Sequence, residues 1–254
     1  MKIIPTISLI SVLTFLSLTT NVHAGLTDIE TTILRGSYDQ VESLVADYLA
    51  QNPSPENALE ARYYLGLSYL HRKQYGEAKN LFEALTKEKT DDLLRDKIHL
   101  GLLDAHYMNE QYKEALKIGE NLLKLSPRSM FLSLIYLKLG RANLKLSYWR
   151  QAQQYFKKIV RNFSQSLEYD AAKQLLEEKK YFAVQVGAFM DRGRAEHLME
   201  ELKERGEYAY IVEMLDQKNR KFYRVRVGQL ALLDQAKQVR SRLATQGYPT
   251  QIYP

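Results

Sequence analysis

Apolar residues recur at helical spacing from Leu26 to about Glu178, and the few glycines and prolines stand between the apolar runs. This periodicity predicts amphipathic helices joined by short turns. The last of them is expected at Leu167–Glu178, with Leu167, Ala171, Leu175 and Leu176 on its apolar side. Aromatic and small residues repeat every 37 positions, at Tyr38, Tyr75, Tyr112 and Trp149 and at Ala78, Ala115 and Ala152. A period of this length predicts stacked helix–turn–helix units, because a single pair cannot bury its apolar face alone.

The last quarter of the chain changes to the two-residue alternation of strands. Four strands are expected, at Phe182–Val186, Tyr208–Met214, Phe222–Val227 and Thr250–Tyr253. Helices are expected from Asp191 to Arg205 and from about Leu232 to Thr245. The order β-α-β-β-α-β predicts a split βαβ, ferredoxin-like sheet with both helices on one face. Val186-Gly187 recurs as Val227-Gly228, which indicates one unit built twice.

Alternation also predicts which side chains share a face of this sheet. Phe182, Val184 and Val186 are expected to face the helices, as are Tyr223, Val225 and Val227. The opposite face then carries Ala183, Gln185, Tyr210, Val212, Phe222, Arg224, Arg226, Gln251 and Tyr253. No further segment is expected to cover it, so it is interpreted as a recognition surface. The alternative is that this face docks onto the helical region.

The N-terminus has the layout of a signal peptide. Lys2 is followed by a mostly apolar run, and Val22-His23-Ala24 provides small residues at the −3 and −1 positions. We expect three parts: a signal peptide at 1–24, a helical repeat domain at 25–179 and a sheet domain at 180–254. An uncleaved membrane anchor is the alternative for the first part, but the run is short for a bilayer span. No other membrane span is expected.

Charge is unevenly distributed between the two folded parts. Residues 25–179 hold 22 basic and 21 acidic side chains, whereas residues 180–254 hold 13 basic and 9 acidic ones. The excess positive charge of the sheet domain suits an anionic or polar partner.

The chain lacks recognisable catalytic chemistry. It has no cysteine, and neither a Gly-x-Ser-x-Gly nor a Walker A pattern occurs. Of the histidines after residue 24, His99 and His106 share a helix face without a third ligand at metal spacing. We therefore expect a non-catalytic protein with no cofactor and no metal. An unrecognised cell-wall hydrolase remains the alternative.

The helical repeat resembles the tetratricopeptide (TPR) family. Leu65-Gly66, Tyr69, Ala78 and Phe82 stand at the signature spacing in the second unit, as do Leu139-Gly140, Ala152 and Phe156 in the fourth. The third unit departs from this signature, because Leu103 stands at the position of the small glycine. The resemblance implies a surface that binds another protein, here an unidentified envelope or division protein. A passive spacer is the alternative.

The doubled sheet domain resembles a SPOR domain, through Val184-Gln185-Val186-Gly187-Ala188-Phe189 and Tyr223-Arg224-Val225-Arg226-Val227-Gly228. Such domains are implied to bind bacterial peptidoglycan, favouring glycan strands without stem peptides at the division septum. By position, Gln185 corresponds to the glutamine of the first-strand motif and Phe222 to a bulky residue opening the third strand. Ala188 stands where many members have serine, so a hydroxyl contact is lost.

The residue chemistry agrees with a sugar ligand. Phe222 or Tyr210 can stack on an apolar sugar face, and the Gln185 amide can both donate and accept. Arg224 and Arg226 supply donors to hydroxyl and carbonyl oxygens. We expect a periplasmic or envelope protein, enriched at division sites, that binds peptidoglycan through the sheet and a partner through the helices. In one alternative the helical scaffold is the main function and the sheet domain only a tether.

RNA-binding modules share this β-α-β-β-α-β layout. They require an Arg/Lys-Gly-aromatic-Gly-aromatic strand, and Tyr223–Gly228 lacks that pattern. No nucleic-acid partner is expected.

Overall fold

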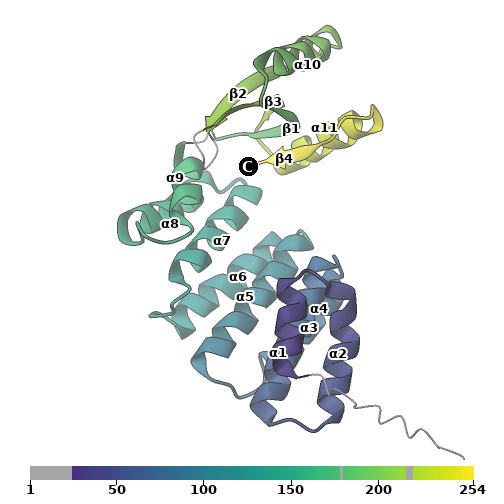
Figure 1. The fold of residues 1–254 in the computed structure, drawn as a ribbon. Helices are drawn as coiled ribbons and strands as arrows, with labels where there is room; N and C mark the ends of the chain where they lie inside the picture. The colour runs from purple at the N-terminus through teal and green to yellow at the C-terminus, as the bar shows by residue number, and fades with distance from the viewer. Residues whose placement is uncertain (1–24, 178–179, 216–219) are drawn as a thin grey trace, which may run out of the picture.

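The computed structural model describes residues 25–177, 180–215 and 220–254, so the expected signal peptide at 1–24 lies outside the described residues. The described part of the first domain consists of helices stacked as antiparallel pairs (Figure 1). Their bounds are α1 Leu26–Leu34, α2 Tyr38–Ala50, α3 Pro55–His71, α4 Tyr75–Leu85, α5 Asp92–Met108, α6 Tyr112–Leu125, α7 Leu132–Lys145, α8 Trp149–Asn162 and α9 Tyr169–Glu177.

The backbone conformation of the array also repeats every 37 residues. The periodic aromatics are the first residues of α2, α4, α6 and α8. Two positions before each of them, the turn adopts a positive φ, at Gly36 (75°), Lys73 (61°), Glu110 (59°) and Ser147 (62°). Left-handed backbone is costly for residues other than glycine, and here three of four turns accept it. The turn conformation therefore repeats although its residue type does not.

Small residues bring neighbouring helix pairs together. The ring of Phe82 on α4 fills the space beside Gly66 on α3 and Gly101 on α5, where an added Cβ would lie 2.5 Å from a ring atom. Phe156 occupies the same role beside Gly140. The third unit lacks a glycine at position 103, but Gly101, two positions earlier, provides the close approach. The repeat prediction is thus confirmed, with a shifted contact in the third unit.

Helix α9 closes the end of the stack. Ala172 is fully buried, and Ala171, Leu175 and Leu176 pack on the cluster formed with α7 and α8. The prediction placed Leu167 on the same apolar side. That assignment is wrong, because Leu167 precedes the helix and is 98% exposed.

The second domain is a four-stranded antiparallel sheet in the order β2-β3-β1-β4. Its elements are β1 Phe182–Phe189, α10 Arg192–Glu204, β2 Ala209–Leu215, β3 Lys221–Leu230, α11 Leu233–Thr245 and β4 Gln251–Tyr253. Val184, Val186, Val225 and Val227 pack against Ala195 and Leu202 of α10 and Leu243 of α11, so both helices cover one face, as predicted. The chain therefore combines an all-α helical-hairpin array with an α+β split βαβ domain.

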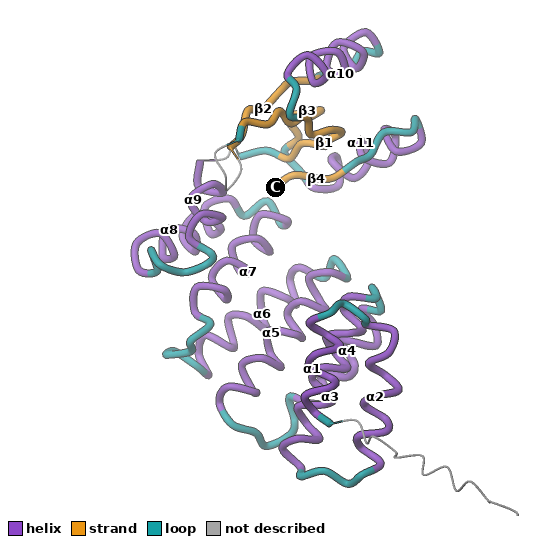
Figure 2. The backbone as a smooth tube through the Cα atoms, viewed as in Figure 1, coloured by secondary structure: helices purple, strands orange, loops and turns teal. Residues whose placement is uncertain are grey.

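The two domains are in contact through described residues. The ring of Trp149 on α8 lies 5.0 Å from that of Phe182 on β1, and Phe182 is buried against α11. Lys145 Nζ donates to the Pro254 carbonyl oxygen at 2.7 Å, and Lys237 on α11 pairs with Glu110. The sheet therefore sits at the α7–α9 end of the array, and α11 also contacts the array, whereas α10 lies farther from it (Figure 2).

Candidate functional site

A β-bulge determines which β1 side chains share the face opposite the helices. Gln185 pairs with Arg226, but the register shifts between Gln185 and Gly187, so Ala188 pairs with Arg224. Strict alternation would place Ala188 with Val186 on the helix side. Because of the extra residue, Ala188 instead lies on the same face as Gln185. Ala188 is the position where many members of the family have serine, so this position also lies on that face.

One corner of this face gathers three of the predicted site residues. Ala188 is the register partner of Arg224, and the Arg224 guanidinium lies 5.0 Å from the centre of the Phe222 ring. A cavity of about 220 Å³ opens beside them, lined by Ala188, Phe189, Met190, Arg220, Lys221 and Phe222. We call Ala188, Phe222 and Arg224 with this cavity the basic corner.

Arg220, Lys221 and Met190 were not singled out from the sequence. Arg220 and Lys221 are exposed, and together with Arg224 they make the corner strongly cationic. Met190 is also exposed and adds an apolar wall. Each of the three flanks a strand end, where alternation gives no information about direction. The local surplus of basic residues after Asn219 was the available signal.

Arg226 differs from its prediction as a solvent-facing residue. It is only 2% exposed, and its guanidinium stacks on the Tyr253 ring at 3.7 Å from the ring centre. Ala183, expected on the same face, is 1% exposed and is the register partner of Tyr253. The physical reason is that Tyr253 of the edge strand leans across the face and covers its centre.

Helix α9 adds to this cover. The Gln174 amide donates to Tyr253 OH at 3.3 Å and to Met214 Sδ at 3.7 Å, and these acceptors belong to the two edge strands β4 and β2. The alternative that the sheet face docks onto the helical region is therefore realised in part. Gln185 and Tyr210 are half-buried, and Tyr210 OH donates to the Gly228 carbonyl oxygen at 3.4 Å.

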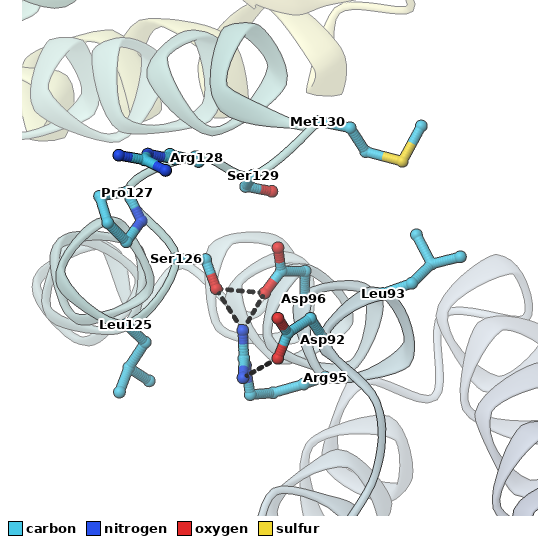
Figure 3. A pocket seen from close by; sticks show the side chains of 10 residues that line it. All are labelled: Asp92, Leu93, Arg95, Asp96, Leu125, Ser126, Pro127, Arg128, Ser129 and Met130. Atoms are coloured by element: carbon cyan, nitrogen blue, oxygen red, sulfur yellow. Dashed lines mark hydrogen bonds and ion pairs between the residues drawn. The ribbon is translucent and has the colours of Figure 1, made fainter.

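The helical region has its own cavity, of about 380 Å³, at the α5 start and the α6–α7 connection (Figure 3). Its floor is a polar network: Arg95 donates to Ser126 Oγ at 2.7 Å, and Ser126 donates to buried Asp96 at 2.5 Å. Leu93, Leu125 and Met130 on its wall are exposed. A fixed polar floor below exposed apolar side chains is a candidate protein-binding surface.

The predicted histidine roles can be compared directly with their contacts. His99 Nδ1 lies 2.9 Å from the Arg95 carbonyl oxygen, and His106 Nδ1 lies 2.8 Å from Gln111 Oε1. Over residues 25–177, 180–215 and 220–254, no group of three or more His, Asp or Glu side chains is arranged to hold a metal. Among the helices of these same ranges, none is long and apolar enough to span a bilayer.

Comparison with known families places the sheet domain. The SPOR domain model matches residues 178–254, so a SPOR domain occupies the C-terminal part of this chain. The match begins two residues before the boundary predicted at 180. The preceding helical region is TPR-like, as its repeated hairpins show. No curated protein matches the chain.

Two solved structures are similar to the chain. One is PlcR of Bacillus thuringiensis, solved with the peptide PapR7 and DNA, with a TM-score of 0.52 and 20% identity over 61% of this chain and 59% of that one. The other is a tetratricopeptide repeat protein of Parabacteroides merdae, with a TM-score of 0.48 and 14% identity over 71% and 65%. The chain thus spans less than two thirds of either protein. At this identity the PlcR likeness concerns the fold alone.

Proposed function

We propose that this protein binds peptidoglycan glycan strands through its SPOR domain, favouring strands stripped of stem peptides, and that it acts without catalysis. The observation that carries the proposal is the basic corner. Phe222 offers a ring face for an apolar sugar surface, and Arg224, Arg220 and Lys221 offer cationic donors around a cavity. Removal of a stem peptide leaves a carboxylate on the sugar, which such donors would bind.

Binding at the basic corner is compatible with the cover over the middle of the face. The Arg226 guanidinium stacks on the Tyr253 ring and is buried, so it is not presented to a ligand in this arrangement. Gln185 is half-buried and next to the cover. We therefore expect Phe222 and Arg224 to contribute more to glycan affinity than Arg226 does.

The test is co-sedimentation of the full chain with intact and with amidase-treated sacculi. Stronger retention on the treated sacculi supports the proposal, and negligible binding to both contradicts it. Phe222→Ala and Arg224→Ala should each weaken binding about tenfold, which corresponds to about 1.4 kcal/mol. Arg194→Ala, an exposed arginine on the helix side, is the matched control and should bind as the parent chain does.

We further propose that residues 1–24 direct export to the periplasm and that the glycan preference enriches the protein at division sites. SPOR domains are typical of bacterial envelope proteins, which supports this location. Fluorescent fusions of the full chain should collect at septa, and fusions carrying Phe222→Ala should spread around the envelope. Uniform labelling by both would contradict septal targeting.

For the helical region we propose binding of an envelope or division protein at the cavity beside Leu125 and Met130. The exposed apolar wall supports this over a passive spacer. Met130→Asp should abolish cross-linking to a neighbour in intact cells. Leu34→Asp, an equally exposed apolar site at the other end of the array, is the control. Unchanged cross-linking in the Met130 variant would contradict this surface.

A further inference from the structure

Far from the basic corner, the sheet domain carries a cluster of tyrosines around one amide. The Gln229 Nε2 group donates to Tyr181 OH at 3.4 Å and to Tyr208 OH at 3.3 Å. The Tyr208 and Tyr210 rings lie 5.8 Å apart at an interplanar angle of 49°. We call Tyr181, Tyr208, Tyr210 and Gln229 the tyrosine patch.

The tyrosine patch is partly open to solvent, mainly at Tyr208 and Gln229. Tyr208 is 61% exposed and Gln229 is exposed as well, whereas Tyr181 and Tyr210 are half-buried. None of the four belongs to the cluster that forms the core of the domain between the sheet and its helices. Aromatic rings held at a surface by hydrogen bonds present flat apolar faces with polar hydroxyls at their rims. Such a surface suits a ligand with the same mixed character.

The patch and the basic corner lie on the same side of the sheet. Tyr208 continues the alternation of Tyr210, Val212 and Met214 along β2, which is the side of Phe222 and Arg224. Phe222 and Gln229 are seven residues apart on β3, which at about 3.3 Å per residue separates them by on the order of 20 Å. A ligand that touches both must therefore be an extended polymer rather than a single sugar.

The chemistry of the two patches is different. The basic corner offers cations, whereas the tyrosine patch has hydroxyls, one amide and no charged side chain. Its amide uses Nε2 toward the tyrosines, and Oε1 is an acceptor suited to a sugar hydroxyl or an acetamido N–H. A ring face next to an acceptor matches an N-acetylated pyranose.

We propose that the tyrosine patch is a second sugar-binding subsite, which takes an N-acetylated pyranose ring of the strand whose anionic part lies at the basic corner. This inference rests on the glycan binding proposed above. It requires that affinity depend on strand length, because only a long strand reaches both ends of the face. Such a strand must also pass around the cover that Tyr253 and Gln174 form over the middle of the face.

The test measures the affinity of the full chain for stem-peptide-free glycan fragments by titration calorimetry, with a disaccharide and with a long strand. Tyr208→Ala should weaken binding of the long strand roughly tenfold and leave the affinity for the disaccharide at the basic corner unchanged. Tyr208→Phe keeps the ring and should retain at least most of the affinity. Tyr148→Ala, an exposed tyrosine of the helical region, is the matched control.

The outcomes separate this subsite from the function on which it rests. Equal affinity of the parent and Tyr208→Ala chains for the long strand overturns the subsite but leaves glycan binding intact. Absence of binding by the parent chain overturns both. Chitin oligomers of matched length share the N-acetylated ring but lack the lactyl carboxylate. They should bind weakly, and Tyr208→Ala should still reduce their binding; an unaffected variant would contradict ring stacking.

Discussion

Sequence periodicity predicts the packing of the helical array better than it predicts the packing of the sheet domain. In the array, each unit packs on its immediate neighbours, and Phe82 meets Gly66 and Gly101 from the two adjoining helices. In the sheet domain, the face opposite α10 and α11 is shaped by Tyr253 and by Gln174 from the other domain. Periodicity therefore describes packing well where partners are close in sequence, and less well where they are remote.

The most severe way to break the array is to remove a ring that two helix pairs share. Phe82→Ala should lower the free energy of unfolding of the helical region by about 3–5 kcal/mol, because Phe82 is fully buried and its removal leaves a cavity between glycines that cannot fill it. Urea unfolding followed by circular dichroism measures this. Gly76→Ala, with no atom within 4 Å of the added Cβ, should be neutral or slightly stabilising. A loss below about 1 kcal/mol would contradict the shared-ring packing.

The domain interface gives a second test through the charge of Lys145. Burial is the main cause that lowers the pKa of Lys145; Glu110 opposes it, and Arg141, Arg240 and Lys237 add to it, so that the pKa lies at about 8. Below about pH 8 Lys145 is protonated in both the folded and the unfolded chain, so the folded chain carries the full cost of burying the ammonium group. Between about pH 8 and 10 the unfolded chain binds more protons than the folded one, and stability rises with pH.

This rise should amount to about 1–2 kcal/mol between pH 8 and 10, measured by urea unfolding of the full chain. Lys145→Met, which has no charge to bury, should flatten the profile in that window. The buried tyrosines set the upper limit, since burial raises the pKa of Tyr107 to about 12 and its ionisation destabilises the fold above pH 10. A parent chain whose stability falls from pH 8 to 9 would contradict a buried Lys145 ammonium.

The cover over the sheet face can be tested by removing one amide. Gln174→Ala deletes the hydrogen bonds to Tyr253 and Met214 and should cost about 1 kcal/mol. Amide hydrogen exchange in β4 should become faster while exchange in α3 and α5 is unchanged. Lys173→Ala, on the same helix and exposed, serves as the control. Unaltered exchange in β4 would mean that α9 does not hold the face.

These contrasts explain what could be inferred from sequence. The order of strands and helices follows from alternation and turn residues, and the valines of β1 and β3 were placed correctly because α10 and α11 are sequence neighbours. The burial of Arg226 could not be inferred, because it depends on Tyr253 crossing from an edge strand. The side of Ala188 depends on the bulge between Gln185 and Gly187, which strict alternation does not predict.

The smallest expected effect concerns the turns of the array, in which the backbone conformation repeats although the residue type does not. Lys73 adopts a φ of 61° at an exposed position where the first unit has Gly36. Lys73→Gly should stabilise the helical region by about 0.5–1 kcal/mol, because glycine adopts left-handed backbone without the steric cost of a Cβ. Lys157→Gly, exposed in the interior of α8, should act in the opposite direction by about 1 kcal/mol, since glycine weakens a helix. Paired urea unfolding curves compare the two, and destabilisation by both substitutions would show that the repeated turn is not strained at Lys73.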